Sequence, residues 1–224
     1  MKIIILDKVD STNDYVKKFI KDKKTVAVAA KRQTKGKGTK GRSFISDEGG
    51  VYVSVLRFYE GLKASSAYSI ISDTAVAVVK TLKAFGVECG IKWPNDVYCN
   101  GKKICGILTE TCINGEYVDY SVIGIGINVN NEIAPEIRDI AVSASEVKGE
   151  KLNVDAVLAT LLFNLERKQE EGLYARYSCV LGRKIKVVKP DGSEYFAVAK
   201  QVMPDGRLML EGGEVLAAAE IFLA

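Results

Sequence analysis

A run of glycines and basic residues between Gln33 and Phe44 has the composition of a loop that binds an anion. The segment reads Gln-Thr-Lys-Gly-Lys-Gly-Thr-Lys-Gly-Arg-Ser-Phe. Glycines let backbone N–H groups approach an anion closely, and the lysine and arginine side chains supply positive charge. Eight basic residues and no acid lie between Asp22 and Asp47, so positive charge is concentrated in this part of the chain. We therefore expect a loop that wraps an anionic group of a ligand.

Two other interpretations of this segment stay open on these residues alone. The spacing from Gly36 to Ser43 nearly fits the P-loop of nucleotide-binding proteins, but Arg42 stands where that pattern has lysine. The residues that follow are turn-like, whereas a P-loop needs a helix whose N-terminus points at the phosphates. A flexible basic loop that binds no ligand would have the same composition.

A second segment places charged residues beside a strongly apolar stretch. Lys92-Trp93-Pro94-Asn95-Asp96 is followed by Lys102-Lys103-Ile104-Cys105-Gly106-Ile107-Leu108. A Trp-Pro pair alone is typical of packing and a turn. Buried charges, however, need partners or ligands. We expect the Lys103 ammonium to lie at a strand end and face a cleft, with Lys102 on the opposite face because side chains alternate along a strand.

A third segment, Gly124-Ile125-Gly126-Ile127-Asn128, alternates glycine with apolar residues. If it forms a strand, one face of that strand has no side chains at the two glycines. Such a bare face permits either close packing of another element or a ligand that lies flat on it.

The composition limits the classes of protein and chemistry. With 47% hydrophobic and 27% charged residues, the 224-residue chain is typical of a soluble globular protein with one core and room for a small second module. No apolar run approaches the roughly 18 residues of a membrane span, and no secretory signal is evident, so we expect a cytoplasmic protein. The net charge of +4 is too small to imply nucleic acid. Without histidine, Ser-His and Cys-His catalysis is excluded, and five cysteines without CxxC spacing predict no metal site.

The periodicity of apolar residues predicts the elements that position these segments. Helical spacing favours helices over residues 12–22, 65–85 and 154–169, and β-rich runs predict strands at residues 1–6, 25–30, 51–56, 96–99, 103–112 and 117–128. After Gly172 the pattern changes to short strands separated by turns such as Pro204-Asp205-Gly206. This change predicts a small antiparallel unit that packs on the main domain.

Together these segments resemble the biotin protein ligases. That family has Ser-Thr-Asn, then Gln-Thr before a Gly-Arg-Gly-Arg-x-Gly-Arg-x-Trp loop, then Lys-Trp-Pro-Asn-Asp, Lys-(Ile/Leu)-x-Gly-Ile-Leu and Gly-Ile-Gly-Ile-Asn. This chain has its counterparts in the same order, at residues 11–13, 33–34, 36–44, 92–96, 103–108 and 124–128. The resemblance implies an α+β fold, with a mixed β-sheet catalytic domain backed by helices (the class II aminoacyl-tRNA synthetase-like biotin/lipoate ligase fold) at residues 1–176. It also implies a small C-terminal SH3-like β-barrel at residues 177–224.

The activity that the resemblance implies is an ATP-dependent ligation. Such an enzyme forms biotinyl-5′-AMP from biotin and ATP, with Mg²⁺ on the phosphates, and transfers the biotin to a lysine of a biotin carboxyl carrier protein. No covalent enzyme intermediate is required, which fits the missing histidine. The resemblance further implies the monofunctional type without a DNA-binding domain, so that no nucleic acid is a partner, and a possible homodimer. Two alternatives are a lipoate protein ligase and a non-catalytic biotin-binding regulator.

The resemblance also implies roles for individual residues. The biotin-binding side is Ser11, Thr12, Asn13, Gln33, Gly36, Lys37, Gly38, Thr39, Lys103 and Gly106. The side that binds ATP and the adenylate is Lys37, Lys40, Arg42, Phe44, Lys92, Asn95 and Asn128. Adenylation brings two anions together, which requires positive charge between them. We assign this catalytic role to Lys103, assisted by Lys37 and Arg42. We expect Asp96 to orient the attacking lysine of the carrier.

Three positions of the loop depart from the family pattern. Lys37 and Thr39 stand where the family has arginines, and Phe44 stands where it has tryptophan. In the family, the arginine at the Thr39 position helps to retain the reactive adenylate. We therefore expect looser retention here unless Lys40 or Arg42 compensates, and stacking of Phe44 on adenine over a smaller area.

Overall fold

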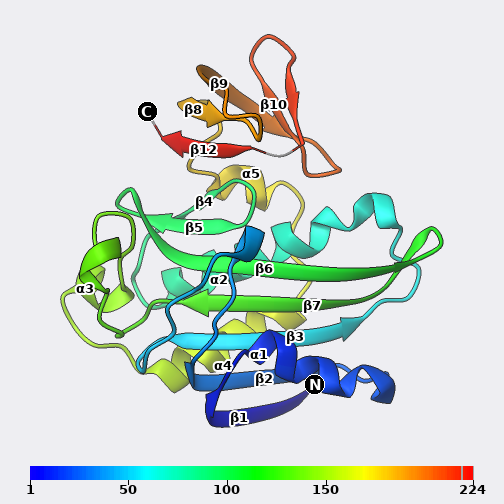
Figure 1. The fold of residues 1–224 in the computed structure, drawn as a ribbon, viewed down its shortest axis with the longest axis vertical. Helices are drawn as coiled ribbons and strands as arrows, with labels where there is room; N and C mark the ends of the chain where they lie inside the picture. Colours follow the sequence, from blue (N-terminus) through cyan, green and yellow to red (C-terminus); the bar gives the residue numbers. More distant parts are fainter. Residues whose placement is uncertain (218, 224) are drawn as a thin grey trace.

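A computed structural model describes residues 1–217 and 219–223, which form two β-sheets and the helices around them (Figure 1). The larger sheet has seven strands in the order β1-β2-β3-β7-β6-β5-β4. Its strands are β1 (Lys2–Val9), β2 (Val26–Gln33), β3 (Val51–Phe58), β4 (Gly90–Lys92), β5 (Asp96–Cys99), β6 (Lys102–Asn114) and β7 (Tyr117–Ile127). The α-helices are α1 (Thr12–Val16), α2 (Tyr68–Ala84), α3 (Ala144–Lys148), α4 (Val154–Glu166) and α5 (Leu173–Tyr177).

The larger sheet is mixed, and helices cover both of its faces. Strands β1 and β2 pair in parallel, and the remaining neighbours in this sheet pair antiparallel. On one face, Val53 and Val55 of β3 join a core with α2 and α4, and Figure 1 shows both helices behind the sheet. On the other face, Leu56 of β3 packs with Val16 of α1. Residues 51–56 are all buried because both faces of β3 are covered. The α+β class with a mixed sheet is confirmed.

Some elements differ from the sequence-based expectation. The helix expected at residues 12–22 is α1 followed by a 3-10 segment, η1 (Lys17–Asp22), and the helix expected at 154–169 ends at Glu166. Further 3-10 turns are η2 (Thr39–Gly41), η3 (Ala64–Ser66) and η4 (Pro135–Ile137). The sequence did not reveal β4, α3 and α5, because elements of three to five residues are too short to show a period.

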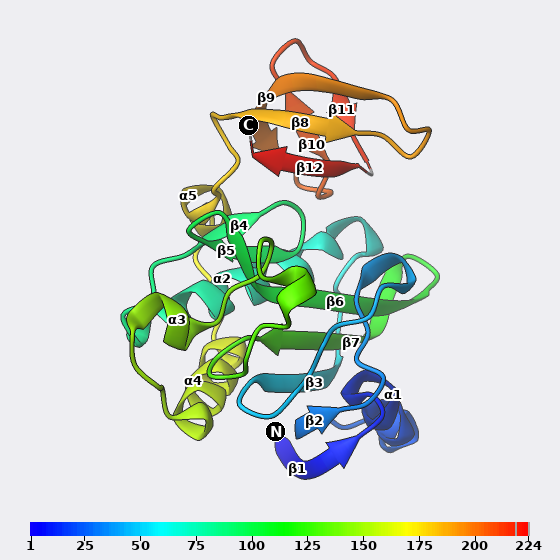
Figure 2. The ribbon, with the colours of Figure 1, turned by 60° about the vertical axis from the view of Figure 1, so that its left-hand side comes forward.

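The second sheet lies beyond α5, next to β4 and β5 in both views (Figures 1 and 2). Its order is β11-β10-β9-β8-β12, with β8 (Lys184–Val188), β9 (Glu194–Val202), β10 (Leu208–Leu210), β11 (Val215–Leu216) and β12 (Glu220–Leu223). These five strands form the small antiparallel unit that was expected at the C-terminus, and among the described residues no pairing joins β11 to β12, so closure into an SH3-like barrel stays a prediction. The domain boundary at 176/177 falls at the end of α5 and stays a prediction.

One residue of the larger unit belongs to the core of the small sheet. Trp93, which is 4% exposed, packs with Ile185, Val187 and Leu208. Its indole Nε1 donates a hydrogen bond to the Gly206 carbonyl oxygen at 2.8 Å. Trp93 therefore contributes to the packing between the two units.

No helix in the described part of the chain is long and apolar enough to cross a membrane.

Candidate active site

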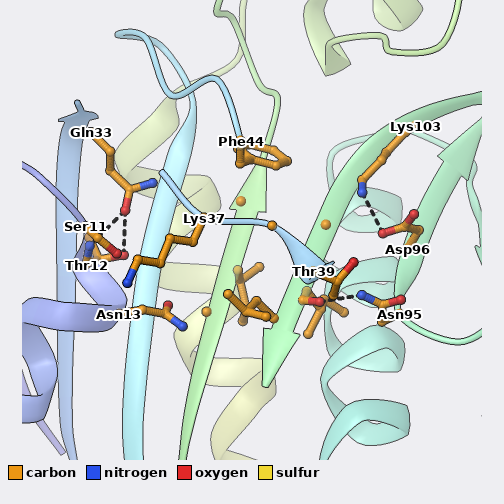
Figure 3. Close-up of a pocket in the computed structure, with 17 residues that line it drawn as sticks. Ser11, Thr12, Asn13, Gln33, Lys37, Thr39, Phe44, Asn95, Asp96 and Lys103 are labelled. Carbon is orange, nitrogen blue, oxygen red and sulfur yellow. Dashed lines mark hydrogen bonds and ion pairs between the residues drawn. The ribbon is translucent and has the colours of Figure 1, made fainter. Parts of the chain in front are cut away.

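A cleft opens on the face of β6 and β7 that carries the glycines (Figure 3). The start of α1, the end of β2, the turn before β5 and a loop that crosses the cleft complete its walls. We call this loop, residues 33–46, the basic loop. The lining residues are Ser11, Thr12, Asn13, Gln33, Lys37, Gly38, Thr39, Phe44, Asn95, Asp96, Lys103, Gly106, Ile107, Leu108, Gly124, Ile125 and Gly126.

The floor of the cleft is a glycine face formed by Gly106, Gly124 and Gly126. Gly106 and Gly126 are cross-strand partners of β6 and β7. The ring of Phe44 lies on this pair, because a Cβ atom added to Gly126 would be 2.7 Å from the ring and one added to Gly106 would be 3.3 Å from it. At Gly124 an added Cβ would overlap the side chain of Asn13. The bare face therefore accommodates two side chains that themselves line the cleft.

Gly124→Ala is expected to lower the free energy of unfolding by about 1–3 kcal/mol. The added methyl group would displace Asn13, whose Oδ1 lies 2.5 Å from Ser54 Oγ in a buried contact. Chemical denaturation would measure the loss. Gly38→Ala is the matched control, because the nearest atoms to its methyl group all belong to Arg42 and the closest of them, the carbonyl oxygen, is 3.3 Å away. Equal losses in the two variants would contradict this explanation of Gly124.

A polar wall of Ser11, Thr12, Asn13 and Gln33 forms one side of the cleft. The backbone N–H and hydroxyl of Thr12 donate to Gln33 Oε1 at 2.8 and 3.0 Å. Gln33 Nε2 in turn donates to Ser46 Oγ at 2.9 Å. These bonds connect the start of α1, the end of β2 and the far end of the basic loop.

Two residues that support the polar wall were missed from the sequence. Ser54 is completely buried on β3, and its Oγ lies 2.8 Å from Thr12 Oγ1. Glu110 of β6 accepts a hydrogen bond from Asn13 Nδ2 at 3.1 Å and forms an ion pair with Lys17 at 2.8 Å. The sequence did contain a signal for Ser54, which is a hydroxyl residue within the apolar run of residues 51–56. Since buried polar groups are usually hydrogen-bonded, a serine in such a strand indicates a polar partner.

On the opposite side, the Lys103 ammonium and the Asp96 carboxylate face each other (Figure 3). Lys103 Nζ lies 2.7 Å from Asp96 Oδ1, and the side chains are 33% and 23% exposed. Asn95 Nδ2 donates to the Ile107 carbonyl oxygen at 2.6 Å, which fixes the turn before β5 against β6. Lys102 Nζ instead donates to the Arg138 carbonyl oxygen at 2.7 Å, away from the cleft lining.

The cationic side chains of the basic loop are held by carboxylates at the rim. Lys37 Nζ lies 2.7 Å from a carboxylate oxygen of Asp14. The hydrogen bond from Lys37 lowers the pKa of Asp14, against the opposing effect of its partial burial. Lys40 and Arg42 both pair with Glu220 of β12 and are more than half exposed. The structure thus brings Lys37 to the cleft, but it does not bring Lys40 or Arg42 there.

Three further predicted site residues lie outside the cleft lining. Gly36 packs beneath the Phe44 carbonyl and Ser46. Lys92 lies over the rings of Tyr98 and Phe222, 4.6 and 5.1 Å from their centroids, and burial lowers its pKa. Asn128 is 5% exposed and donates to the Val142 carbonyl oxygen at 3.3 Å, so its amide fastens the chain that leaves β7. In the described part of the chain, no three Cys, Asp or Glu side chains are grouped to hold a metal ion.

The sequence model of the biotin/lipoate A/B protein ligase family matches residues 5–128, the stretch that contains every lining residue of the cleft. The chain belongs to this family. The bifunctional ligase/repressor BirA of Bacillus subtilis is 34% identical over 203 residues, which cover 84% of this chain and 62% of that protein. The chain thus spans less than two thirds of that relative. The biotin--[acetyl-CoA-carboxylase] ligase of Mycobacterium tuberculosis is 28% identical over 208 residues, which cover 84% of this chain and 74% of that one.

A solved member of the biotin/lipoate ligase family has the same fold over its whole length. It is the biotin protein ligase from Aquifex aeolicus in complex with biotin and ATP, with a TM-score of 0.77 and 29% identity. The match covers 100% of this chain and 98% of that one, so it includes the second sheet. The biotin/lipoate ligase fold expected from the sequence motifs is confirmed.

Proposed function

We propose that this protein is an ATP-dependent biotin protein ligase, which forms biotinyl-5′-AMP and transfers the biotin to a lysine of a biotin carboxyl carrier protein. The observation that carries this proposal is the Lys103 ammonium, which faces a cleft with a bare glycine floor on one side and hydrogen-bonding groups on the other. The residues that line the cleft lie within the part of the chain that matches the family model, and a member of that family from Aquifex aeolicus was solved with biotin and ATP.

The polar wall and the floor fit the ring system of biotin. A ureido group offers two N–H donors and one carbonyl acceptor, and Ser11, Thr12 and Gln33 supply both donors and acceptors. Leu108, the cross-strand partner of Gly124, lines the cleft on the glycine face and offers apolar contact to the fused ring and the carbon chain. A biotin so bound directs its carboxylate along the floor towards Lys103.

In the first step the biotin carboxylate attacks the α-phosphorus of ATP, the acyl-adenylate forms and pyrophosphate leaves. Both reactants are anions, so the barrier falls when a fixed positive charge lies between them. Lys103 supplies that charge, and Asp96 holds the ammonium in place at 2.7 Å before the substrates bind. Lys37 adds a second cation from the basic loop.

The nucleotide side requires the basic loop to rearrange. The Phe44 ring, which lies on the glycine face, stacks on adenine after it is displaced from that face. Lys40 and Arg42 reach the phosphates only when they leave Glu220. Asp96 is the one carboxylate among the cleft-lining residues, so Mg²⁺ would be held mainly by phosphate oxygens and would neutralise their charge.

In the second step the carrier lysine attacks the acyl carbon of the adenylate and AMP leaves. The amine must be neutral to attack, and Asp96 orients it and accepts its proton. This chemistry uses intracellular ATP, and the described cysteines are all free thiols, so we infer a cytoplasmic location. A homodimer stays a prediction.

Isotope exchange between pyrophosphate and ATP tests the proposed first step. Exchange that depends on added biotin supports the proposal. Exchange that depends on lipoate and not on biotin identifies the other branch of the family. Tight binding of biotin with no exchange identifies a biotin-binding regulator instead of an enzyme.

The amides of the basic loop are expected to exchange rapidly in the free protein and to become protected when biotin and ATP bind. Glycines raise the entropy of the free loop, and charge pairing with the ligand offsets the loss of that entropy. Exchange measured by mass spectrometry over residues 33–46 checks this, with β7 as an internal reference that should not change. Equal protection of the loop with and without ligands would refute it.

A further inference from the structure

The turn of residues 93–96 carries two cleft residues on one side and two anchors on the other. Asn95 and Asp96 line the cleft. Trp93 is buried in the core of the small sheet, and the Pro94 carbonyl oxygen accepts a hydrogen bond from outside the larger sheet. The position of Asp96 in the cleft therefore depends on groups outside the cleft, namely those that contact Trp93 and Pro94.

The first anchor is Trp93, whose Nε1 donates to Gly206 at 2.8 Å. Gly206 cannot be another residue without strain, because its φ is +87° and a Cβ atom there would overlap the ring of Tyr68. The acceptor carbonyl is thus held in place by the tight Met203–Arg207 turn, which is closed by two 2.8 Å backbone hydrogen bonds.

The second anchor is Tyr174 of α5, whose hydroxyl donates to the Pro94 carbonyl oxygen at 3.1 Å. The Tyr174 ring packs edge-on against Tyr68 of α2, with 5.9 Å between the centroids. Burial, with a contribution from Tyr68, raises the pKa of Tyr174 well above its ordinary value. The hydroxyl therefore stays protonated and remains a donor throughout the physiological pH range.

The sheet alone holds this turn weakly. The turn connects β4 and β5, which have three and four residues, and β4 is the last strand of its sheet. Beyond β4 the described part of the chain supplies one bridge, between Ile91 and Ser178. The β5–β6 register also shifts after Val97. An error of about 1 Å in a catalytic group can cost as much as 10²-fold in rate, so external anchors matter here.

We propose that Tyr174 is a positioning residue, which, together with the Trp93–Gly206 hydrogen bond, holds the turn so that Asp96 stays opposite Lys103. This inference rests on the proposed function, because it requires Asp96 to act in transfer. It assigns α5 and the small sheet a part in the chemistry, although none of their residues lines the cleft in the part of the chain that the structure describes.

Tyr174→Phe keeps the ring and removes only the hydroxyl. We expect it to slow single-turnover transfer of biotin from the adenylate to the carrier by about threefold to tenfold, the usual cost of one hydrogen bond. The KM for biotin should stay within about twofold of the original value, since the polar wall is untouched. Tyr195→Phe is the matched control: its hydroxyl donates to Glu214 at 2.8 Å, and neither residue lines the cleft, so transfer should not change.

A double-mutant cycle separates positioning from a general structural role. If Tyr174 acts through Asp96, Tyr174→Phe should cause no further loss in an Asp96→Asn background. Trp93→Phe, which removes the N–H donor to Gly206, should show the same lack of additivity. Losses that multiply in the double variants, or normal transfer by Tyr174→Phe, would overturn the proposal. If the unaltered protein forms no biotinyl product, the proposed function has failed instead.

Discussion

Replacing Lys103 by alanine is expected to slow formation of the acyl-adenylate by about 10²–10³-fold, equivalent to roughly 3–4 kcal/mol of lost transition-state stabilisation. The ammonium faces the cleft and is held there by Asp96 at 2.7 Å. Among the described lining residues the other cation is Lys37, which is on the basic loop and is paired with Asp14. Single-turnover synthesis of the adenylate from biotin and ATP measures the effect.

Lys102→Ala is the internal control for this experiment. Its Nζ bonds to the Arg138 carbonyl oxygen outside the cleft, so adenylate formation should be close to normal. Asp96→Ala should impair transfer to the carrier more than it impairs adenylate formation. A crippled Lys102→Ala beside a nearly normal Lys103→Ala would show that the wrong lysine has been assigned. All three variants should fold, since these side chains are outside the described cores.

Trp93→Ala is expected to destabilise the protein by about 3–5 kcal/mol. The side chain is 4% exposed and fills a core otherwise made by the small sheet, so its removal leaves a cavity between the two units. The Gly206 carbonyl oxygen also loses its donor. The free energy of unfolding from denaturant titration measures the loss.

Phe196→Ala provides the comparison for Trp93→Ala within the same sheet. Phe196 is 58% exposed, so its removal should cost far less than the loss of the buried indole. A Trp93→Ala variant within 1 kcal/mol of the original stability, on the order of a surface substitution, would show that the indole does not hold the two units together.

The sequence alone predicted much of the cleft, because the chemistry depends on local patterns. Alternation along β6 predicted opposite directions for Lys102 and Lys103, and the structure shows them so. The alternating glycines predicted a bare face on β7. Both predictions follow from the twofold period of a strand, which needs no knowledge of tertiary contacts.

Other parts of the site depend on contacts between distant segments, which no local pattern encodes. Asn13 fills the space above Gly124, and Ser54 supports Thr12 from another strand. Asn128 follows the glycine motif, but its amide bonds to the chain beyond β7. Its Nδ2 donates to the Val142 carbonyl oxygen, and its Oδ1 accepts from Asn131 Nδ2. The partner of Arg42, Glu220, is 178 residues away, so no local pattern could indicate this pairing, and the nucleotide role that the resemblance implies for Arg42 stays a prediction.

The packing of the second unit was also beyond the sequence. The turns predicted there are present, and Gly206 at φ +87° is the clearest, but nothing in the Pro204-Asp205-Gly206 pattern indicates a partner. Trp93 was expected to pack and to begin a turn, and the structure adds that it packs in the core of the other sheet. Its neighbours Asn95 and Asp96 line the cleft, so one short motif serves both stability and the site.

Ligase activity is tested by the mass spectrum of a biotin carboxyl carrier domain after incubation with this protein, biotin and ATP. We expect one biotinyl group to be added to the carrier, on a single lysine, and we expect the addition to require both ATP and biotin. A parallel reaction with Lys103→Ala should show far slower modification. An unmodified carrier, with folded protein and both substrates present, would contradict the assignment of this protein as a biotin ligase.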